Sequence, residues 1–263
     1  MRSAAETPDW EQFVSELRFR AGIDLDAYKP GQVQRRVRGL MLRSGVGEFG
    51  DYLRLLDSEP AKRQELQTYV TVAVSEFFRT PEQFQHLADI ILPRLLKRRR
   101  RLRIWSAGCS YGAEPYSLAM LLHELAPRGG HHLLATDVDE LALARGRAAD
   151  SFTERDLRHV RPELRFHFVP SGHKGRYALT PELSSDVTFQ RQDLLAGAAE
   201  SDFDLIVCRN VMIYFTDDAK RRLYATLYSA LRLGGYLFVG DAEVLNRLPE
   251  AGFTQEAVGF YRK

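Results

Sequence analysis

The sequence predicts an α/β protein in which a mostly parallel sheet follows a helical N-terminal segment. Three observations carry this prediction. Apolar residues recur at helical spacing through the first part of the chain. From Leu102 onward, strand-like apolar runs alternate with helical patterns, as in a doubly wound sheet. Within 151–191 this alternation gives way to short β-like pieces separated by turn residues such as Pro170, Gly172 and Pro181, which indicates a small antiparallel insertion.

The N-terminal segment contains four predicted helices, three of which carry a clear apolar stripe. The stripes consist of Trp10, Phe13, Val14 and Leu17, of Val33, Val37, Leu40 and Met41, and of Phe49, Tyr52, Leu53 and Leu56. A fourth helix is predicted over Glu65–Val72. The run Thr80-Pro81-Glu82-Gln83 then predicts the capped start of a long helix that ends near Arg99.

The remaining elements give the predicted order of the α/β part. They are a strand at 102–107, a helix at 114–126, a strand at 132–136, a helix at 139–147, a strand at 203–208, a helix at 218–231, a strand at 236–239 and one or two edge strands within 253–262. We therefore expect a helical domain over 1–80, a linking helix over 81–101, and an α/β domain over 102–263 with the insertion at about 151–191.

Composition excludes several classes of protein. The chain has 263 residues, of which 44% are hydrophobic, an ordinary value for a globular protein. The longest apolar run is shorter than the ~18 residues of a membrane span. Two cysteines argue against a disulfide scaffold and for a reducing, cytoplasmic setting. The seven histidines show no metal-ligand spacing, so no metal site is predicted.

The net charge is +2, but the cations gather in two clusters. Arg35, Arg36, Arg38 and Arg43 lie largely off the apolar stripe of the second helix and form a candidate basic face for an acidic partner. Lys97–Arg101 is interpreted as a solvated helix end, where cations are favourable. No aromatic residue interleaves with it, which argues against nucleic-acid binding.

The segment Leu102–Met120 predicts a strand, a small-residue turn and a helix. Gly108 and Gly112 allow a tight turn, and the helix that follows presents free N–H groups to a ligand. Asp137 directly follows the next strand, where an acid can accept both hydroxyls of a ribose. A helix cap is the alternative role for this residue, although Asp139 could equally provide it.

The turn favours one kind of ribose-containing cofactor. It lacks the Gly-x-x-x-x-Gly-Lys-Ser/Thr loop that cradles phosphates and the Gly-x-Gly-x-x-Gly of nicotinamide enzymes. Ribose recognition without a diphosphate loop suits S-adenosylmethionine (SAM), so methyl transfer is favoured over hydride transfer. Arg209, Asn210 and Tyr214 follow the strand at 203–208, at the end of the sheet where ligand sites collect.

The chain resembles the CheR family of chemotaxis receptor glutamate methyltransferases over nearly its whole length. The motifs that carry the resemblance are Ser75-Glu-Phe-Phe-Arg79, Trp105-Ser-Ala-Gly-Cys-Ser110 with Gly112 and Glu114-Pro-Tyr-Ser117, Ala135-Thr-Asp-Val-Asp139, Cys208-Arg-Asn-Val-Met-Ile-Tyr-Phe215, and Gly234-Gly-Tyr-Leu-Phe238 with Glu243. It implies a Rossmann-like SAM methyltransferase sheet, an N-terminal helical domain and a β subdomain. It also implies that the enzyme methylates glutamate side chains of chemoreceptors and releases S-adenosylhomocysteine (SAH).

The resemblance assigns roles to individual residues. Arg79 and Tyr214 are implied at the transfer site. The implied cofactor contacts are Ser75, Arg79, Ala107, Gly108, Glu114, Asp137, Asp193, Leu194 and Arg209, with Asp137 on the ribose and Asp193 and Leu194 at the adenine. Arg35, Arg36, Arg38 and Arg43 are implied to contact an acidic helical bundle of the receptor. We expect a monomer that neither inserts into a membrane nor binds nucleic acid.

The chain departs from the usual family pattern around the cofactor. Tyr111 and Ala113 stand where Thr and Glu are typical, and Asp193 stands where Asn is typical. An ionised Asp only accepts hydrogen bonds, whereas Asn can also donate. Two alternatives therefore stay open: a weakly active member that binds SAM or SAH and acts through protein contacts, and a carboxyl methyltransferase with another substrate.

Overall fold

The structure of the chain is a computed structural model that describes residues 8–21, 23–71, 75–243 and 252–263. The chain divides into two compact units. The helical unit comprises 1–73 and 213–221, and the sheet unit comprises 74–212 and 222–263. Among the described residues, no helix combines the length and apolar character needed to cross a membrane.

In the described residues of its N-terminal part, the helical unit contains four helices. They are α1 (Pro8–Ala21), α2 (Pro30–Arg43), α3 (Phe49–Ser58) and α4 (Pro60–Thr71). The twelve apolar residues of the three predicted stripes are all buried, so the helical periodicity identified this core correctly. The rings of Trp10, Phe13 and Phe49 lie 5.0 to 5.6 Å apart at its centre. The fourth helix begins earlier than predicted, at Pro60, whose fixed φ suits a first helical turn.

A distant piece of the chain belongs to the helical unit. Lys29 N donates to Tyr214 O at 2.9 Å, and Thr216 N donates to Ala27 O at 2.9 Å. The rings of Tyr28 and Phe215 meet edge to face, with centroids 5.1 Å apart. Tyr214 is therefore held by the backbone that precedes α2.

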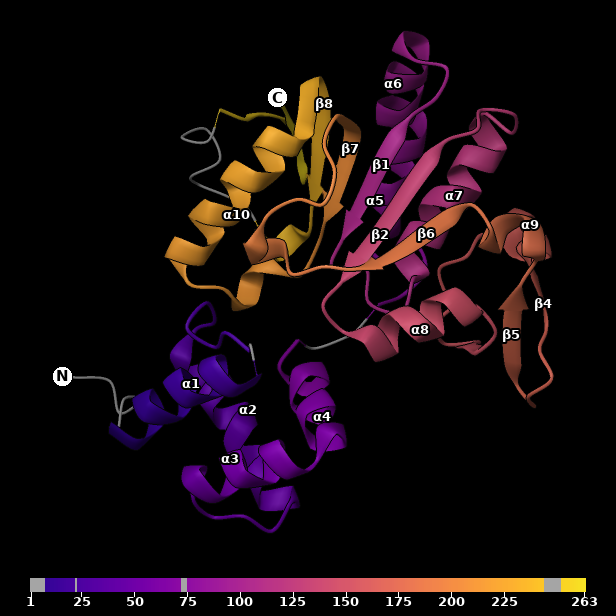
Figure 1. Cartoon of the computed structure of the whole chain (residues 1–263). Coiled ribbons are helices and arrows are strands. Elements are labelled where there is room, and N and C mark those ends of the chain that lie inside the picture. The colour runs from indigo at the N-terminus through magenta and orange to yellow at the C-terminus, as the bar shows by residue number, and fades with distance from the viewer. Residues whose placement is uncertain (1–7, 22, 72–74, 244–251) are drawn as a thin grey trace. The chain divides into compact units, whose positions relative to one another are not determined.

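The sheet unit is built on a seven-stranded sheet of order β6-β2-β1-β7-β8-β10-β9 (Figure 1). The strands are β1 (Arg103–Ala107), β2 (His132–Asp137), β6 (Val187–Arg191), β7 (Phe203–Cys208), β8 (Leu231–Val239), β9 (Thr254–Ala257) and β10 (Phe260–Arg262). The first five run parallel, while β10 and β9 add an antiparallel edge. The carboxyl ends of the parallel strands therefore share one side of the sheet, which confirms the predicted Rossmann-like α/β class.

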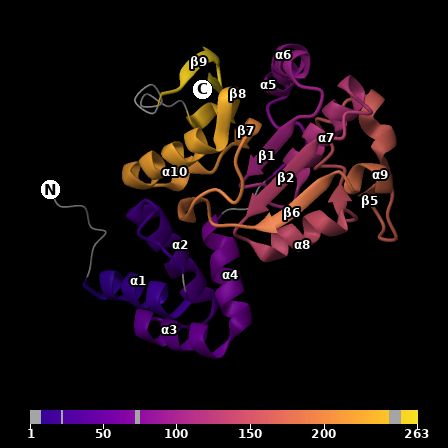
Figure 2. The ribbon, with the colours of Figure 1, turned by 45° about the horizontal axis from the view of Figure 1, so that its top comes forward.

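Helices join and cover these strands. They are α5 (Pro81–His86), α6 (Leu92–Arg98), α7 (Ala113–Leu125), α8 (Glu140–Ala148) and α10 (Asp217–Ala230). Figure 2 shows α8 beside β6 and β2, which it contacts. Short 3-10 turns occupy Pro162–His167, Leu194–Ala196, Met212–Tyr214 and Asp241–Glu243.

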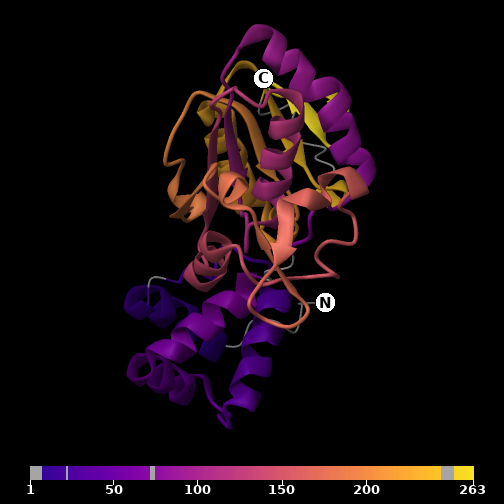
Figure 3. The same ribbon diagram turned by 90° about the vertical axis from the view of Figure 1, so that its right-hand side faces the viewer.

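The predicted linking helix is part of the sheet unit rather than a separate connection. Its Phe84 ring packs edge to face against Phe238 of β8 with centroids 5.8 Å apart. Between α5 and α6 the helix widens to a π-helical turn over Leu87–Ile91. Pro93 follows this turn, and a proline inside a helix removes one donor and crowds the preceding turn. Figure 3 shows the helical run from α5 to α6 as one long helix on the outside of the sheet unit. The helix begins at Pro81 after Thr80, as predicted, but Thr80 has φ 62° and its side chain makes no capping hydrogen bond, so that part of the prediction is wrong.

The insertion is smaller than predicted. Its antiparallel sheet has the order β3-β5-β4, formed by β3 (Phe152–Thr153), β4 (Phe168–Pro170) and β5 (Arg176–Leu179), and α9 (Pro181–Ser184) follows. The prediction that Val187–Arg191 belongs to it is wrong, because this segment, β6, pairs in parallel with β2. An edge strand exposes part of its surface, so β6 carries the half-polar pattern of an antiparallel strand.

Gly112 is fixed by its backbone and by its neighbours. Its φ is +91°, and a Cβ there would lie 2.9 Å from Cζ of Phe189 and 3.1 Å from Cε2 of Tyr116. We expect Gly112→Ala to lower the free energy of unfolding by about 2 kcal/mol, through left-handed strain and overpacking. Chemical denaturation measures the change. Gly172→Ala is the control, because nothing lies within 4 Å of that Cβ position. Equal stability of the two variants would contradict this account.

Candidate active site

The turn after β1 is held from the neighbouring strand. The N–H groups of Gly108 and Cys109 both donate to Thr136 O, at 2.8 and 2.9 Å. Gly108 and Ser110 have positive φ values of 83° and 52°. A Cβ on Gly108 would lie 2.5 Å from a methyl carbon of Val211, so packing against the loop after β7 already requires glycine here.

Asp137 organises the same turn. Its Oδ2 accepts from Ser110 N at 2.8 Å and its Oδ1 accepts from Asp139 N at 3.0 Å. Burial raises the pKa of this carboxyl, and the two backbone N–H groups offset part of the rise. Asp139, not Asp137, caps α8 by accepting from Leu141 N and Ala142 N. Asp137 is therefore a partly buried acid at a strand end without a capping role in α8.

Asp193 and Leu194 lie at the end of the adjacent strand. Gln192 N donates to Asp137 O at 2.9 Å, which joins the two strand ends. Asp193 accepts from Leu195 N at 2.9 Å, and Leu194 is buried. The polar side chain of Asp193 therefore follows β6 on the side of the sheet where Asp137 follows β2.

Glu114 and Arg209 form a buried pair of opposite charge. Ser106 Oγ donates to Glu114 Oε1 at 2.8 Å, and Arg209 Nη1 lies 3.7 Å from Glu114 Oε2. Burial raises the pKa of Glu114, while the nearby Arg209 guanidinium opposes the rise. Burial likewise lowers the pKa of Arg209, and Glu114 opposes that change.

Arg209 is held by groups from several segments. Its Nη2 donates to Arg79 O at 2.8 Å and to Gln83 Oε1 at 3.0 Å. Its Cζ lies 4.6 Å from the Phe238 ring centroid and 5.3 Å from that of Phe84. The guanidinium is thus fixed by charge, hydrogen bonds and cation–π contacts.

Arg79 sits in a strained turn. The residues on either side, Phe78 and Thr80, have φ values of 52° and 62°. Phe78 N donates to Ser117 Oγ at 2.9 Å, and the Arg79 carbonyl accepts from Arg209. Left-handed conformations of such residues cost roughly 1 to 3 kcal/mol each and persist where the surroundings enforce them. Arg79 is half-buried in this turn.

Tyr111 joins three parts of the sheet unit. Its hydroxyl contacts Asp156 Oδ1 at 2.9 Å and the carbonyl oxygen of Ser75. The Arg145 guanidinium lies over its ring, 4.0 Å from the centroid. The Ser75 carbonyl thus meets the turn after β1 through Tyr111.

Gln83 and Glu243 are organising residues whose roles the sequence did not reveal. Gln83 Nε2 donates to Asp241 Oδ1 at 2.5 Å while its carbonyl accepts from Arg209. Glu243 accepts from Asn210 N and Met212 N at 2.7 Å and from Gly240 N at 3.0 Å. These carboxylate bonds shape the loop after β7. The family motif pointed to Glu243, but local sequence ascribed Gln83 only to a cap.

The helical unit holds the other predicted site residues. Tyr214 lies under Arg36, whose Cζ is 5.2 Å from the ring centroid. Arg36 also donates to the carbonyls of Tyr69 and Val70. Arg38 and Arg43 lie over the rings of Phe49 and Tyr69, at 4.9 and 4.4 Å.

Arg35 differs from the other three arginines of α2. It is exposed, as Arg38 and Arg43 are, but within the described part of the chain it has neither an ion pair nor the ring contact that each of the others makes. Arg43, by contrast, lies 3.8 Å from Glu65. The predicted basic face therefore contains one outward cation and three that also pack on their own unit.

Among the described residues, no group of three His, Cys, Asp or Glu side chains could hold a metal ion. Cys109 and Cys208 are buried free thiols whose pKa values burial raises well above the ordinary value.

The role of Glu243 can be measured through stability. We expect Glu243→Gln to lower the free energy of unfolding by about 2 kcal/mol, because the amide cannot accept at both oxygen positions from the three backbone donors. Chemical denaturation measures the loss. Glu82→Gln is the matched control at an exposed position. A loss no larger than that of the control would show that the carboxylate does not hold the loop.

Comparison with known proteins identifies both parts of the chain. Residues 73–257 match the family model described as "CheR methyltransferase, SAM binding domain". Residues 8–71 match "CheR methyltransferase, all-alpha domain". Four charged residues described above, Glu114, Asp137, Arg209 and Glu243, all lie in the first match.

Curated relatives agree over most of their length. A chemotaxis protein methyltransferase of Listeria monocytogenes is 34% identical and is covered over 97% of both chains. Chemotaxis protein methyltransferase 1 of Pseudomonas aeruginosa is 33% identical over 94% of both. The chemotaxis protein methyltransferase of Escherichia coli is 32% identical over 92% of this chain and 86% of its own. This chain therefore belongs to the CheR family of SAM-dependent methyltransferases.

Proposed function

We propose that this chain transfers a methyl group from SAM to glutamate side-chain carboxylates of chemoreceptor proteins. The observation that carries the proposal is the buried Glu114–Arg209 pair at the carboxyl ends of the sheet, inside the matched SAM-binding region. Relatives named as chemotaxis protein methyltransferases over nearly the full length support this choice of substrate.

The residues around the turn suit SAM chemically. Each oxygen of Asp137 accepts one backbone N–H and keeps a further lone pair for a ribose hydroxyl. Ser110 Oγ is buried and has no hydrogen-bond partner among the described residues, so a polar ligand would satisfy it. Glu114 supplies a carboxylate for an ammonium group, while Asp193 can accept from an exocyclic amine. When bound, SAM supplies a methyl group on a positively charged sulfur.

The proposed reaction needs no general base from the chain. A glutamate carboxylate is already ionised at neutral pH and can attack directly. The contribution of the chain is to orient the carboxylate and to exclude water. We assign orientation to Arg79, whose turn is strained and tied to Arg209, and to Tyr214. Ser75, Ala107, Gly108 and Leu194 complete the proposed cofactor contacts.

The proposed receptor contact is the exposed face of α2. Arg35 carries the outward charge, and Arg38 and Arg43 extend it, while Arg36 contributes mainly by supporting Tyr214. Such a face complements an acidic helical bundle and speeds association more than it tightens binding. We also propose that the protein acts in the cytoplasm as a monomer.

The decisive assay incubates the chain with labelled SAM and receptor-containing membranes and counts base-labile methyl esters. Because Arg79 is proposed to orient the carboxylate for attack on the methyl group, we expect Arg79→Ala to reduce kcat/KM on the order of 100-fold. We expect a smaller loss for Tyr214→Phe and none for exposed Arg155→Ala. Full activity in the first two variants would refute the assigned site. Tight SAM binding with no ester on any receptor would favour the alternative of a binding protein.

The raised pKa of Asp137 predicts a pH effect on cofactor affinity. Ribose hydroxyls need an ionised acceptor, so affinity falls as pH drops through the pKa of this carboxyl. Since burial raises that pKa, the loss begins at a higher pH than the ordinary value of 3.8 would give. Calorimetry with SAM across pH measures it. Asp137→Asn should remove this step, whereas exposed Asp150→Asn should keep it. An unchanged profile in the first variant would rule out the ribose role.

A further inference from the structure

A cationic surface lies at the amino-terminal end of the parallel strands, away from Asp137 and Arg209. We define it by four cations and one apolar side chain: Lys97, Arg98, Arg100, Arg101 and Leu233. All five are exposed. They come from the end of α6, the connection to β1, and a bulge in β8. The methyl-transfer proposal gives none of them a role.

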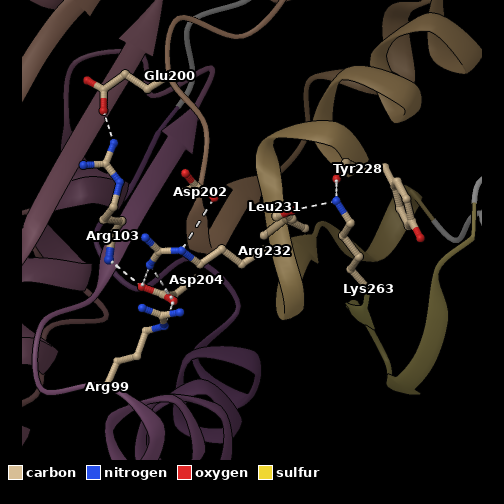
Figure 4. Close-up of polar contacts among 9 residues, drawn as sticks. All are labelled: Arg99, Arg103, Glu200, Asp202, Asp204, Tyr228, Leu231, Arg232 and Lys263. Carbon is tan, nitrogen blue, oxygen red and sulfur yellow. Dashed lines mark hydrogen bonds and ion pairs between the residues drawn. The ribbon is translucent and has the colours of Figure 1, made fainter.

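The acids at this end of the sheet are already neutralised. Asp204 is buried and accepts from Arg103 N at 2.8 Å and from Arg232 Nη1 at 3.2 Å, with Arg99 Nε at 3.3 Å (Figure 4). Glu200 pairs with Arg103 and with His132 Nε2.

Two further charges at this end are also used internally. Asp202 lies 3.8 Å from Arg232, and Lys263 Nζ donates to the carbonyls of Tyr228 and Leu231. In the described part of the chain, the carboxylates of Glu200, Asp202 and Asp204 therefore already have cationic partners.

The four cations have no ion-pair partner in the described ranges. Arg98 lies against the β8 bulge, because a Cβ on Gly234 would lie 2.7 Å from its Nη1. Arg101 lies against the loop before β2, because a Cβ on Gly130 would lie 3.5 Å from its Nε. The helix dipole of α6 favours Lys97 and Arg98 in its last turn, but Arg100 and Arg101 lie beyond that helix.

Leu233 adds an apolar element beside these cations. Its side chain is 89% exposed. β8 is irregular between Leu231, which pairs with Phe203, and Tyr236, which pairs with Leu205, so the intervening residues bulge from the ladder. An exposed leucine next to arginines is suited to bind a surface that has anionic headgroups above an apolar interior. The defined surface contains no aromatic side chain on which a nucleic-acid base could stack.

We propose that this end of the sheet unit binds peripherally to an anionic phospholipid surface. Lys97, Arg98, Arg100 and Arg101 would contact headgroup phosphates, and Leu233 would enter the headgroup–acyl boundary. Clustered cations attract such surfaces, and the attraction falls within a Debye length. The carboxyl ends of the strands, with the proposed cofactor site, lie at the opposite end of the sheet.

The test is co-sedimentation of the full chain with vesicles of equal parts phosphatidylglycerol and phosphatidylcholine. We expect binding to these vesicles, none to pure phosphatidylcholine, and a steep loss as salt rises. Removing three cations in Arg98→Gln/Arg100→Gln/Arg101→Gln should weaken binding on the order of 100-fold. Leu233→Ser should weaken it severalfold in low salt and high salt alike, because its contribution is not electrostatic.

Matched variants separate this surface from total charge. Arg155→Gln/Lys174→Gln/Arg222→Gln removes the same charge from exposed positions elsewhere and should bind like the unmodified chain. Unchanged thermal unfolding and SAM calorimetry show that each variant is folded. Equal weakening by both triple variants, no preference for anionic vesicles, or tighter binding to a single-stranded oligonucleotide at matched salt would overturn the proposal.

Discussion

The sheet unit is organised around one buried charge, the guanidinium of Arg209. Arg209 follows the buried strand β7 and is only 7% exposed. A buried guanidinium without partners costs several kcal/mol, so neighbouring segments must supply them. Glu114 comes from α7, Gln83 from α5, the Arg79 carbonyl from the preceding turn, and the Phe238 ring from β8. Satisfying this cation draws together the segments that carry the proposed active site.

The same requirement explains strain and orientation around the site. The turn at Arg79 presents its carbonyl to Arg209, with left-handed residues on both sides. Gln83 has a defined amide orientation, because its oxygen meets Arg209 and its nitrogen meets Asp241. A side chain fixed in this way would lose little freedom if a ligand bound at the proposed site. At the opposite end of the sheet the charges are paired around Asp204, which accepts from Arg103 N and lies beside the Arg99 guanidinium.

Sequence patterns predicted the elements whose environment is uniform along their length. The stripes of α1, α2 and α3 face the core of the helical unit, and the strands β1, β2 and β7 lie in the core of the sheet unit, so local periodicity reports their burial. The sheet to which the edge strand β6 belongs was predicted incorrectly, because half of the surface of β6 is exposed to solvent. The left-handed Thr80 was missed for another reason, because its turn presents the Arg79 carbonyl to Arg209, which is far away in the sequence.

By itself, the sequence determined the fold class, the order of most elements and the family, because periodicity and motif spacing are local. It also marked Glu114, Asp137 and Arg209 as chemically important. Only the tertiary structure decided how they are used: Asp137 holds the turn while Asp139 caps α8, Glu114 pairs with Arg209, and Gln83 joins the network. Tertiary packing likewise gave three of the four arginines on α2 internal contacts. Hydrogen bonds and ion pairs between residues far apart in sequence depend on where the chain returns, and no local pattern records that.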